Sequence, residues 1–284
     1  IKPELMARVE PIEFKARDEM VIRGYLTRPV NADDGPLPMI VYPHGGPHGV
    51  RDVGLFDPSV QFFANRGYAV LQIDFRGSGG YGLEFFKAGL REYGEAIQDD
   101  ITDGVHWALE QGFADPDRIC IYGGSFGGYA ALMGVVLDPD LYKCAVSFAG
   151  VSDLRRMGRP DSKWFARQVG DFWDDVDKLH RNSPVYRAED ITAPVMLIHG
   201  RLNDVVSWTQ TQLMVDALEE HGKTFDVIYF EDEGHGLYHE ENRVEAHEAI
   251  VAFIGKYISP SSIDPGSPRQ VASSKQSADT SDQP

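Results

Sequence analysis

A serine enclosed by glycines is the strongest chemical signal in the sequence. Ser125 is the centre of Gly-Gly-Ser-Phe-Gly-Gly-Tyr at residues 123–129, which follows an apolar run and precedes a helical pattern. A serine at a sharp strand-to-helix turn adopts a strained backbone, and glycines two residues before and after it leave room for the chain. The helix N-terminus favours developing negative charge. We therefore predict that Ser125 is a nucleophile; the alternative is a glycine-rich turn with an incidental serine.

A serine nucleophile needs a base, and the base needs a carboxylate that orients it. His235 lies between two glycines after the apolar run 225–230, and Asp204 follows the run 195–199. The chain order serine, acid, histidine is the one expected when each residue follows a strand of one α/β sheet. We predict that Asp204 and His235 complete a catalytic triad, with Asp153 as the alternative acid.

Backbone N–H groups must also be aimed at the oxyanion that forms during acyl transfer. The residue after the nucleophile, Phe126, supplies one candidate donor. Gly45 or Gly46, in the loop Tyr-Pro-His-Gly-Gly-Pro-His at residues 42–48, supplies the second. The alternative for that loop is an ordinary Gly-Pro turn. The Tyr42 hydroxyl and the His44 ring are further candidates, and the sequence does not decide between them.

Aromatic residues are candidates for a substrate pocket. Trp164 and Trp173 lie in an aromatic-rich segment without a clean period, where simple packing is the alternative role. Tyr42, His44 and Tyr129 are further candidates for the same pocket.

Two motifs are predicted not to bind a cofactor or a metal. Residues 77–82 fit a dinucleotide fingerprint, but the acids at 99 and 100 fall inside a helical pattern, whereas a ribose-binding acid ends the next strand. His235 and His239 are spaced like zinc ligands, but a glycine occupies the place of the glutamate in such sites. Neither His239 nor His247 is expected to be catalytic.

Composition narrows the class of protein. The 284 residues are 42% hydrophobic and 25% charged, and 27 basic against 44 acidic residues give a net charge of −17. This charge argues against nucleic acid or an anionic membrane as the main partner. No run approaches the ~18 apolar residues of a membrane span. We expect a cytoplasmic protein, a piece of a longer chain because it begins with Ile1, with Cys120 and Cys144 as buried reduced thiols.

The pattern of apolar runs and helical segments predicts an α/β fold with a mostly parallel, eight-stranded sheet covered by helices on both faces. A hairpin is expected over residues 9–16 and 20–27. Further strands are expected at 39–42, 68–75, 119–122, 144–148, 195–199 and 225–230, and helices at 60–66, 83–111, 127–137, 208–221 and 243–257.

One catalytic domain is expected over residues 1–258. It includes a lead-in at 1–8 and a helical excursion at 152–190 near the active site. From residue 259 to 284 the composition is poor in apolar residues, so a disordered tail is expected.

These motifs together resemble the catalytic domain of the prolyl oligopeptidase family of serine peptidases, in its acylaminoacyl-peptidase and dipeptidyl-aminopeptidase-like branch. The resemblance runs from about residue 9 to 258 and implies the α/β-hydrolase fold and the triad Ser125, Asp204 and His235. It is carried by the motifs at 42–48, 74–82, 100–104, 115–118, 123–129, 183–184, 199–204 and 234–243.

The chain departs from the family pattern at three points. The usual Val-Pro-x-x-Gln after the acid reads Val-Ser-Trp-Thr-Gln at residues 206–210, and Tyr93 stands where a Trp is often found. Family members usually carry a β-propeller that screens the active site, and no segment of residues 1–284 is expected to form one.

The predicted function is hydrolysis of peptide bonds in short or N-blocked peptides through an acyl-enzyme on Ser125, without a cofactor or metal. A carboxylesterase with the same triad is the alternative activity. An inactive hydrolase fold used for binding, or an inert fragment, is the alternative of another class. The sequence fixes neither the side-chain specificity nor the oligomeric state.

Overall fold

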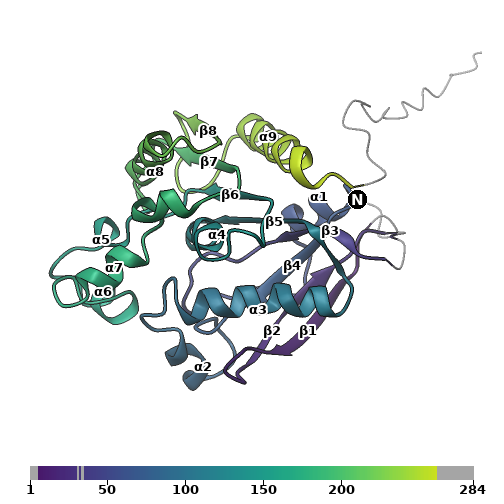
Figure 1. The fold of residues 1–284 in the computed structure, drawn as a ribbon, viewed down its shortest axis with the longest axis horizontal. Helices are drawn as coiled ribbons and strands as arrows, with labels where there is room; N and C mark the ends of the chain where they lie inside the picture. The colour runs from purple at the N-terminus through teal and green to yellow at the C-terminus, as the bar shows by residue number, and fades with distance from the viewer. Residues whose placement is uncertain (1–5, 31, 33–34, 261–284) are drawn as a thin grey trace, which may run out of the picture.

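The computed structural model describes residues 6–30, 32 and 35–260. Within them, eight strands form one sheet (Figure 1). They are β1 (Val9–Lys15), β2 (Val21–Thr27), β3 (Leu37–Val41), β4 (Ala69–Asp74), β5 (Ala114–Gly124), β6 (Cys144–Phe148), β7 (Val195–Gly200) and β8 (Phe225–Phe230). Their order is β1-β2-β4-β3-β5-β6-β7-β8. β2 pairs antiparallel with β1 and β4, and the other neighbours pair in parallel. The predicted mostly parallel, eight-stranded sheet is therefore confirmed.

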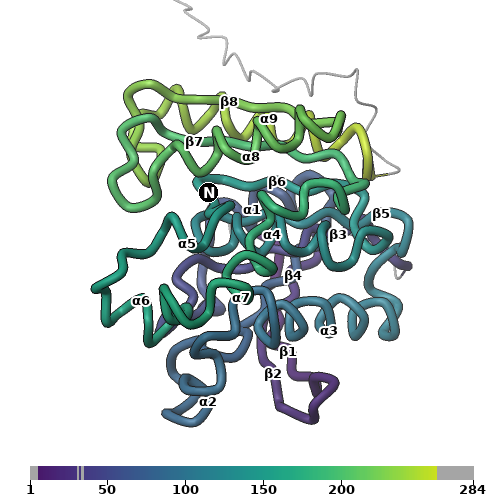
Figure 2. The backbone as a smooth tube through the Cα atoms, turned by 60° about the vertical axis from the view of Figure 1, so that its left-hand side comes forward, coloured from purple at the N-terminus to yellow at the C-terminus, as the bar shows by residue number. Residues whose placement is uncertain are grey.

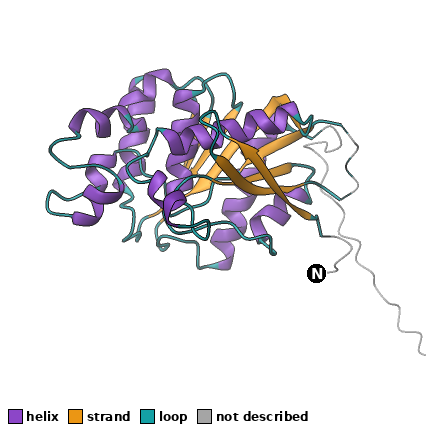
Figure 3. Cartoon of the chain, turned by 90° about the horizontal axis from the view of Figure 1, so that it is seen from below, coloured by secondary structure: helices purple, strands orange, loops and turns teal. Residues whose placement is uncertain are grey.

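Helices cover both faces of the sheet, as predicted (Figure 3). α1 (Pro58–Ala64) and α9 (Glu240–Ile258) pack on one face, whereas α3 (Ala96–Glu110), α4 (Phe126–Leu137) and α8 (Thr209–Glu220) pack on the other. Alternate strand residues divide between the two cores: Ile40 faces α1 and α9, and its neighbours Met39 and Val41 face the opposite layer. Strands buried on both faces explain why the apolar runs show no polar alternation.

The prediction of a single helix over residues 83–111 was wrong. The chain forms α2 (Leu83–Ala88), then a loop, and then α3. Gly89, which ends α2, packs so closely on the chain after β4 that an added Cβ would lie 2.5 Å from the carbonyl oxygen of Arg76. Arg91 and Gly94 have φ values of 67° and 69°, which no α-helix accommodates. Tertiary packing of this loop thus overrides the helical pattern.

The excursion at 152–190 is helical, as predicted, and projects from one side of the molecule (Figure 1). It contains α5 (Leu154–Met157), α6 (Lys163–Gln168), α7 (Val176–Arg181) and the 3₁₀ helix η2 (Pro184–Asp190). The side chain of Gln210, in α8, accepts hydrogen bonds from the N–H groups of Ser152 and Asp153 and donates to the Asp153 carbonyl. The start of the excursion is thereby fixed to α8. Residues 261–284 of the expected tail and residues 1–5 of the lead-in lie outside the described residues.

The expectation of two reduced thiols was wrong in one respect. Cys120 and Cys144 are completely buried, but they form a disulfide. They are directly paired across the parallel strands β5 and β6, with Cα atoms 4.8 Å apart, which is within the range that a disulfide spans. The register that places them opposite one another is not visible in the sequence.

A buried arginine joins the hairpin to the rest of the fold. Arg76, just after β4, donates from its backbone N–H and its guanidinium to Asp100 in α3. The same guanidinium donates to Asp18, in the turn between β1 and β2. None of the described helices is long and apolar enough to cross a membrane.

Candidate active site

Ser125 occupies a strained turn between β5 and α4. Its φ of 57° and ψ of −119° lie outside the regions that most residues adopt, and it stands immediately before the first turn of α4. A Cβ added at Gly123 would lie 2.5 Å from the carbonyl carbon of Gly127, and one added at Gly127 would lie 2.1 Å from the carbonyl oxygen of Pro43. Only glycine fits at either position, so the two glycines make this turn sterically feasible.

His235 reaches Ser125 from the loop that follows β8. Its Nε2 atom lies 3.1 Å from the Ser125 Oγ atom, although the two residues are 110 positions apart in the sequence. Burial lowers the pKa of His235, and the negative charge of Asp204 opposes part of that effect. A neutral imidazole at hydrogen-bond distance from the hydroxyl can accept its proton.

The other side of His235 faces a residue that the sequence analysis missed. The Asn203 Oδ1 atom lies 3.1 Å from His235 Nδ1 and also accepts hydrogen bonds from the N–H groups of Val205 and Val206, at 3.0 and 2.9 Å. Asn203 is buried. The adjacent Asp204 is exposed and makes no hydrogen bond within the described part of the chain, and its charge acts on His235 through space. The only sequence signal for Asn203 was its place beside Asp204 in the same loop.

The loops that carry Asn203 and His235 are joined by a buried glutamate. The N–H of Leu202 donates to the carbonyl oxygen of Glu233. The Glu233 carboxylate accepts hydrogen bonds from the N–H groups of Tyr238 and His239 and from the side chain of Asn242. Burial alone would raise the pKa of Glu233, but these hydrogen bonds lower it to about 2. An ionised Glu233 therefore holds the histidine loop in its turn.

Two of the expected oxyanion donors lie beside Ser125. The N–H of Phe126 is the first of α4, where helix geometry provides no carbonyl partner. A Cβ added at Gly45 would lie 3.5 Å from the Ser125 Cβ, so this glycine lies directly beside Ser125. Gly46 has a φ of 123° and faces Val50 instead.

Comparison with known families agrees with this geometry. The model of the prolyl oligopeptidase family matches residues 55–261, more than half of the chain. The chain belongs to this family. The resemblance drawn from its motifs is thereby confirmed, together with the α/β-hydrolase fold.

Curated relatives and solved structures of the prolyl oligopeptidase family are similar over most of this chain. Dipeptidyl aminopeptidase BIII of Pseudoxanthomonas mexicana is 34% identical over 262 residues, which cover 87% of this chain and 38% of the relative. Dipeptidyl peptidase family member 6 of Caenorhabditis elegans is 33% identical over 273 residues, which cover 85% of this chain and 37% of the relative. A puromycin-hydrolyzing peptidase of Mycobacterium tuberculosis superposes with a TM-score of 0.85 at 26% identity. The superposition covers 91% of this chain and 40% of that peptidase. The chain thus spans less than two fifths of the length of these two curated relatives.

The His44 ring of this family member is built into the base of the oxyanion loop. Its Nε2 atom lies 2.8 Å from the Ser78 Oγ atom, and the ring stacks on Phe75 at a centroid distance of 4.3 Å. His44 is buried, and burial lowers its pKa. The nearby Tyr42 lines a cavity of about 220 Å³ together with Phe148 and Leu237.

The remaining pocket candidates have different surroundings. Tyr129 is completely buried and donates its hydroxyl to the carbonyl oxygen of Asn182, so it supports the wall of the site from within the core. Trp164 and Trp173 are 50% and 65% exposed on the excursion. The alternative acid, Asp153, caps α5 and accepts a hydrogen bond from the Tyr186 hydroxyl.

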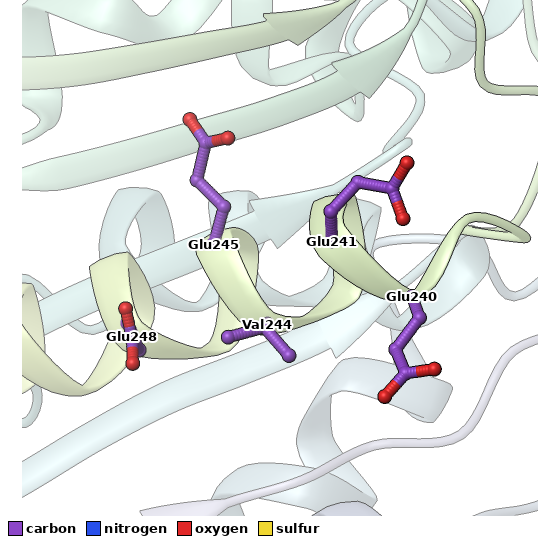
Figure 4. A pocket seen from close by; sticks show the side chains of 5 residues that line it. All are labelled: Glu240, Glu241, Val244, Glu245 and Glu248. Carbon is purple, nitrogen blue, oxygen red and sulfur yellow. The ribbon is translucent and has the colours of Figure 1, made fainter.

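Acidic side chains also cluster on the outer surface of α9, away from these residues in the sequence. Figure 4 shows that the four glutamates there point in different directions along the helix: Glu240, Glu241, Glu245 and Glu248. Among the described residues, no group of three or more histidine, cysteine, aspartate or glutamate side chains is arranged to hold a metal ion.

Proposed function

We propose that the chain is the catalytic domain of a serine peptidase, formed by residues 1–258. The observation that carries this proposal is the 3.1 Å distance between the Ser125 Oγ and His235 Nε2 atoms at the N-terminus of a helix. A hydroxyl, a neutral imidazole and free backbone N–H groups at one point are the components of acyl transfer. Family membership gives the same reaction class.

In this mechanism, Ser125 attacks the carbonyl carbon of the scissile amide while His235 Nε2 takes the hydroxyl proton. The oxyanion accepts hydrogen bonds from the N–H groups of Phe126 and Gly45. His235 then gives its proton to the leaving amine, and the acyl group remains on Ser125. Water, deprotonated by His235, attacks this ester, and the bond to the Ser125 oxygen breaks as His235 returns the proton to it, which releases the acid and restores the hydroxyl. Asp204 stabilises the positive imidazolium electrostatically in both steps.

The proposed substrates are short peptides, including peptides with a blocked amino terminus. Relatives named as dipeptidyl aminopeptidases and a puromycin-hydrolyzing peptidase support an amide substrate of limited size. The exposed Trp164 and Trp173 are the aromatic residues of the excursion that we assign to substrate contact. We further propose that a β-propeller domain of the native protein restricts access to this site.

The test is replacement of the nucleophile. We expect Ser125→Ala to lower kcat by a factor of at least about 10⁴, because no other group in the site attacks the carbonyl. Turnover of aminoacyl, dipeptidyl and N-acyl-aminoacyl anilides should be measured beside p-nitrophenyl esters, so that a peptidase is distinguished from an esterase. A fluorophosphonate should label Ser125 in the unmodified protein.

Thr224→Ala is the matched control, because it removes an exposed hydroxyl immediately before β8, whereas His235 follows the other end of this strand. It should leave turnover and labelling unchanged. Hydrolysis that persists in purified Ser125→Ala protein would exclude Ser125 as the nucleophile. Absence of both turnover and labelling in the unmodified protein would favour an inert domain.

A further inference from the structure

The residue that faces His235 Nδ1 is an amide, where a serine peptidase is expected to have a carboxylate. Asn203 Oδ1 lies 3.1 Å from this nitrogen, and the exposed Asp204 makes no hydrogen bond to any described residue. A triad carboxylate performs two tasks: it holds the imidazole in the correct tautomer and it stabilises the positive charge. In this chain two adjacent residues are placed to perform one task each.

We propose that Asn203 is the positioning residue of His235 and that Asp204 contributes only its charge, so that the two tasks of the triad acid are divided between neighbours. This inference rests on the proposed function, because it assigns a further residue to the same reaction. It differs from the sequence expectation, in which Asp204 alone performs both tasks.

The orientation of the Asn203 amide follows from its backbone partners. The N–H groups of Val205 and Val206 can only donate, and both point at the same side-chain atom as His235 Nδ1. That atom must therefore be the oxygen. An oxygen at this position accepts from Nδ1–H, which leaves the unprotonated Nε2 facing the Ser125 hydroxyl. The hydrogen-bond pattern thus selects the tautomer that a general base requires.

The amide nitrogen of Asn203 lies beside a second histidine. Its Nδ2 atom lies 3.1 Å from the Nε2 atom of His199, a fully buried histidine whose Nδ1 atom lies 2.7 Å from the Thr211 hydroxyl. The same Nε2 atom lies 2.9 Å from the carbonyl oxygen of Val206, which can only accept. The proton of neutral His199 is therefore on Nε2 and donates to Val206, while Nδ1 accepts from the Thr211 hydroxyl. The Asn203 side chain is fixed through its oxygen, which accepts from three N–H groups before substrate binds.

The effect of Asp204 on His235 is weaker than the hydrogen bond that Asn203 makes. It is exposed, and its effect on His235 is purely electrostatic. The interaction between a solvated charge and its neighbour is screened by salt. The contribution of Asp204 should therefore fall as ionic strength rises, whereas the hydrogen bond from Asn203 should not.

Three variants separate the two tasks in the full chain. We expect Asn203→Ala to lower kcat/KM about 10²-fold, mainly through kcat, because the base loses its alignment. Asp204→Asn should lower kcat/KM about threefold at low salt and have no effect at 1 M salt. Asn203→Asp should raise kcat/KM about tenfold, because a carboxylate accepts the same three hydrogen bonds and adds charge.

The pH profile gives a readout that a purely structural role would not change. The imidazole of His235 faces Asp204, the neutral His199 and the Ser125 hydroxyl. Asn203→Asp should move the acid limb of kcat/KM to higher pH, because a carboxylate favours the imidazolium. Asp204→Asn should move the limb to lower pH. Asn65→Ala, at the exposed end of α1, is the matched control and should change neither rate nor profile.

Nitrogen NMR of the histidine rings tests the inference without turnover. In the unmodified protein neutral His235 should carry its proton on Nδ1, and in Asn203→Ala this preference should be lost. If the unmodified protein neither hydrolyses substrate nor labels, the proposed function fails while the tautomer still tests Asn203. Unchanged rate and tautomer in Asn203→Ala, or a loss of about 10⁴-fold in Asp204→Asn, would overturn the proposal.

Discussion

At the scale of single residues, the site depends on a histidine kept neutral by its surroundings. His235 lies against Ser125 on one side and Asn203 on the other, and the partial burial of its ring disfavours the charged form. Neither neighbour carries a charge. The imidazolium that forms during the proposed reaction is therefore stabilised mainly by dipoles and by the charge of Asp204, which makes no hydrogen bond to the ring among the described residues.

The lowered pKa of His235 predicts the pH dependence of the unmodified protein. The base is active when it is neutral, so kcat/KM should rise with pH as His235 loses its proton. Because burial lowers its pKa, the midpoint of that rise should lie below the ordinary histidine value of 6.5. Measuring kcat/KM of a small anilide from pH 4.5 to 9 checks this. A midpoint above 6.5 would indicate a closely paired carboxylate.

At the scale of elements, the loops after β7 and β8 form one unit. The Arg201 N–H donates to the carbonyl oxygen of Phe230, and the Leu202 N–H donates to that of Glu233. These cross-loop hydrogen bonds bring Asn203 to His235. The carboxylate of Glu233 in turn fixes the chain that leads from His235 into α9.

Replacing Glu233 tests the role of this carboxylate. Glu233→Gln places an amide N–H₂ among groups that only donate, so we expect a loss of about 2 kcal/mol in the free energy of unfolding at pH 7. We also expect a lower kcat, since the His235 loop becomes less well fixed. Urea unfolding and steady-state kinetics measure the two effects. Glu248→Gln, exposed on α9, is the control and should change neither.

The effect of Glu233→Gln on the free energy of unfolding should depend on pH. The pKa of Glu233 is about 2 in the folded protein, below its ordinary value of 4.5, so its ionised form stabilises the fold. That contribution is fully present above pH 4.5 and is lost as pH falls towards 2. The difference in stability between the unmodified protein and Glu233→Gln should therefore shrink over this interval. A constant difference would contradict the role assigned to the charge.

At the scale of the whole molecule, the ion pairs that stabilise the hairpin and the residues of the candidate site lie at different parts of the sheet. Figure 2 shows the β1–β2 hairpin at one end and β7, β8, α8 and α9 at the other. The reactive side chains lie in loops after β5, β7 and β8, on the second end and at the centre. The first end is anchored by the buried Arg76, which pairs with Asp100 and Asp18.

Arg76→Ala should destabilise the fold more than it affects the reaction. The substitution leaves the completely buried carboxylate of Asp100 without its partner, and we expect a loss of about 3–5 kcal/mol in the free energy of unfolding. Lys15→Ala, which removes the exposed Lys15–Glu19 pair of the same hairpin, should leave the free energy of unfolding nearly unchanged. Thermal unfolding measures both. Equal effects of the two variants would show that the buried pair does not anchor the hairpin.

Local pattern was sufficient for much of the fold. The central strands β3, β4, β6 and β7 were predicted from apolar runs because they are buried on both faces, a property of short contiguous segments. The serine turn was also predictable, since the clash that excludes a side chain at Gly123 is with Gly127, four residues along the chain. The clash that excludes a side chain at Gly127 is with Pro43, which lies far away in the sequence. The break between α2 and α3 could not be predicted from the sequence, because it depends on the contact between Gly89 and the chain just after β4, at Arg76 and Gly77.

The sequence by itself determined the class of fold and predicted Ser125 and His235 as the residues of a candidate site, because each of these signals is encoded by residues adjacent in the chain. Only the tertiary structure decided which of two neighbours, Asn203 or Asp204, faces His235, and that Cys120 lies opposite Cys144. Both depend on how separate strands and loops are aligned. A shift of one residue in a loop exchanges a buried side chain for an exposed one, and composition and spacing do not record that shift.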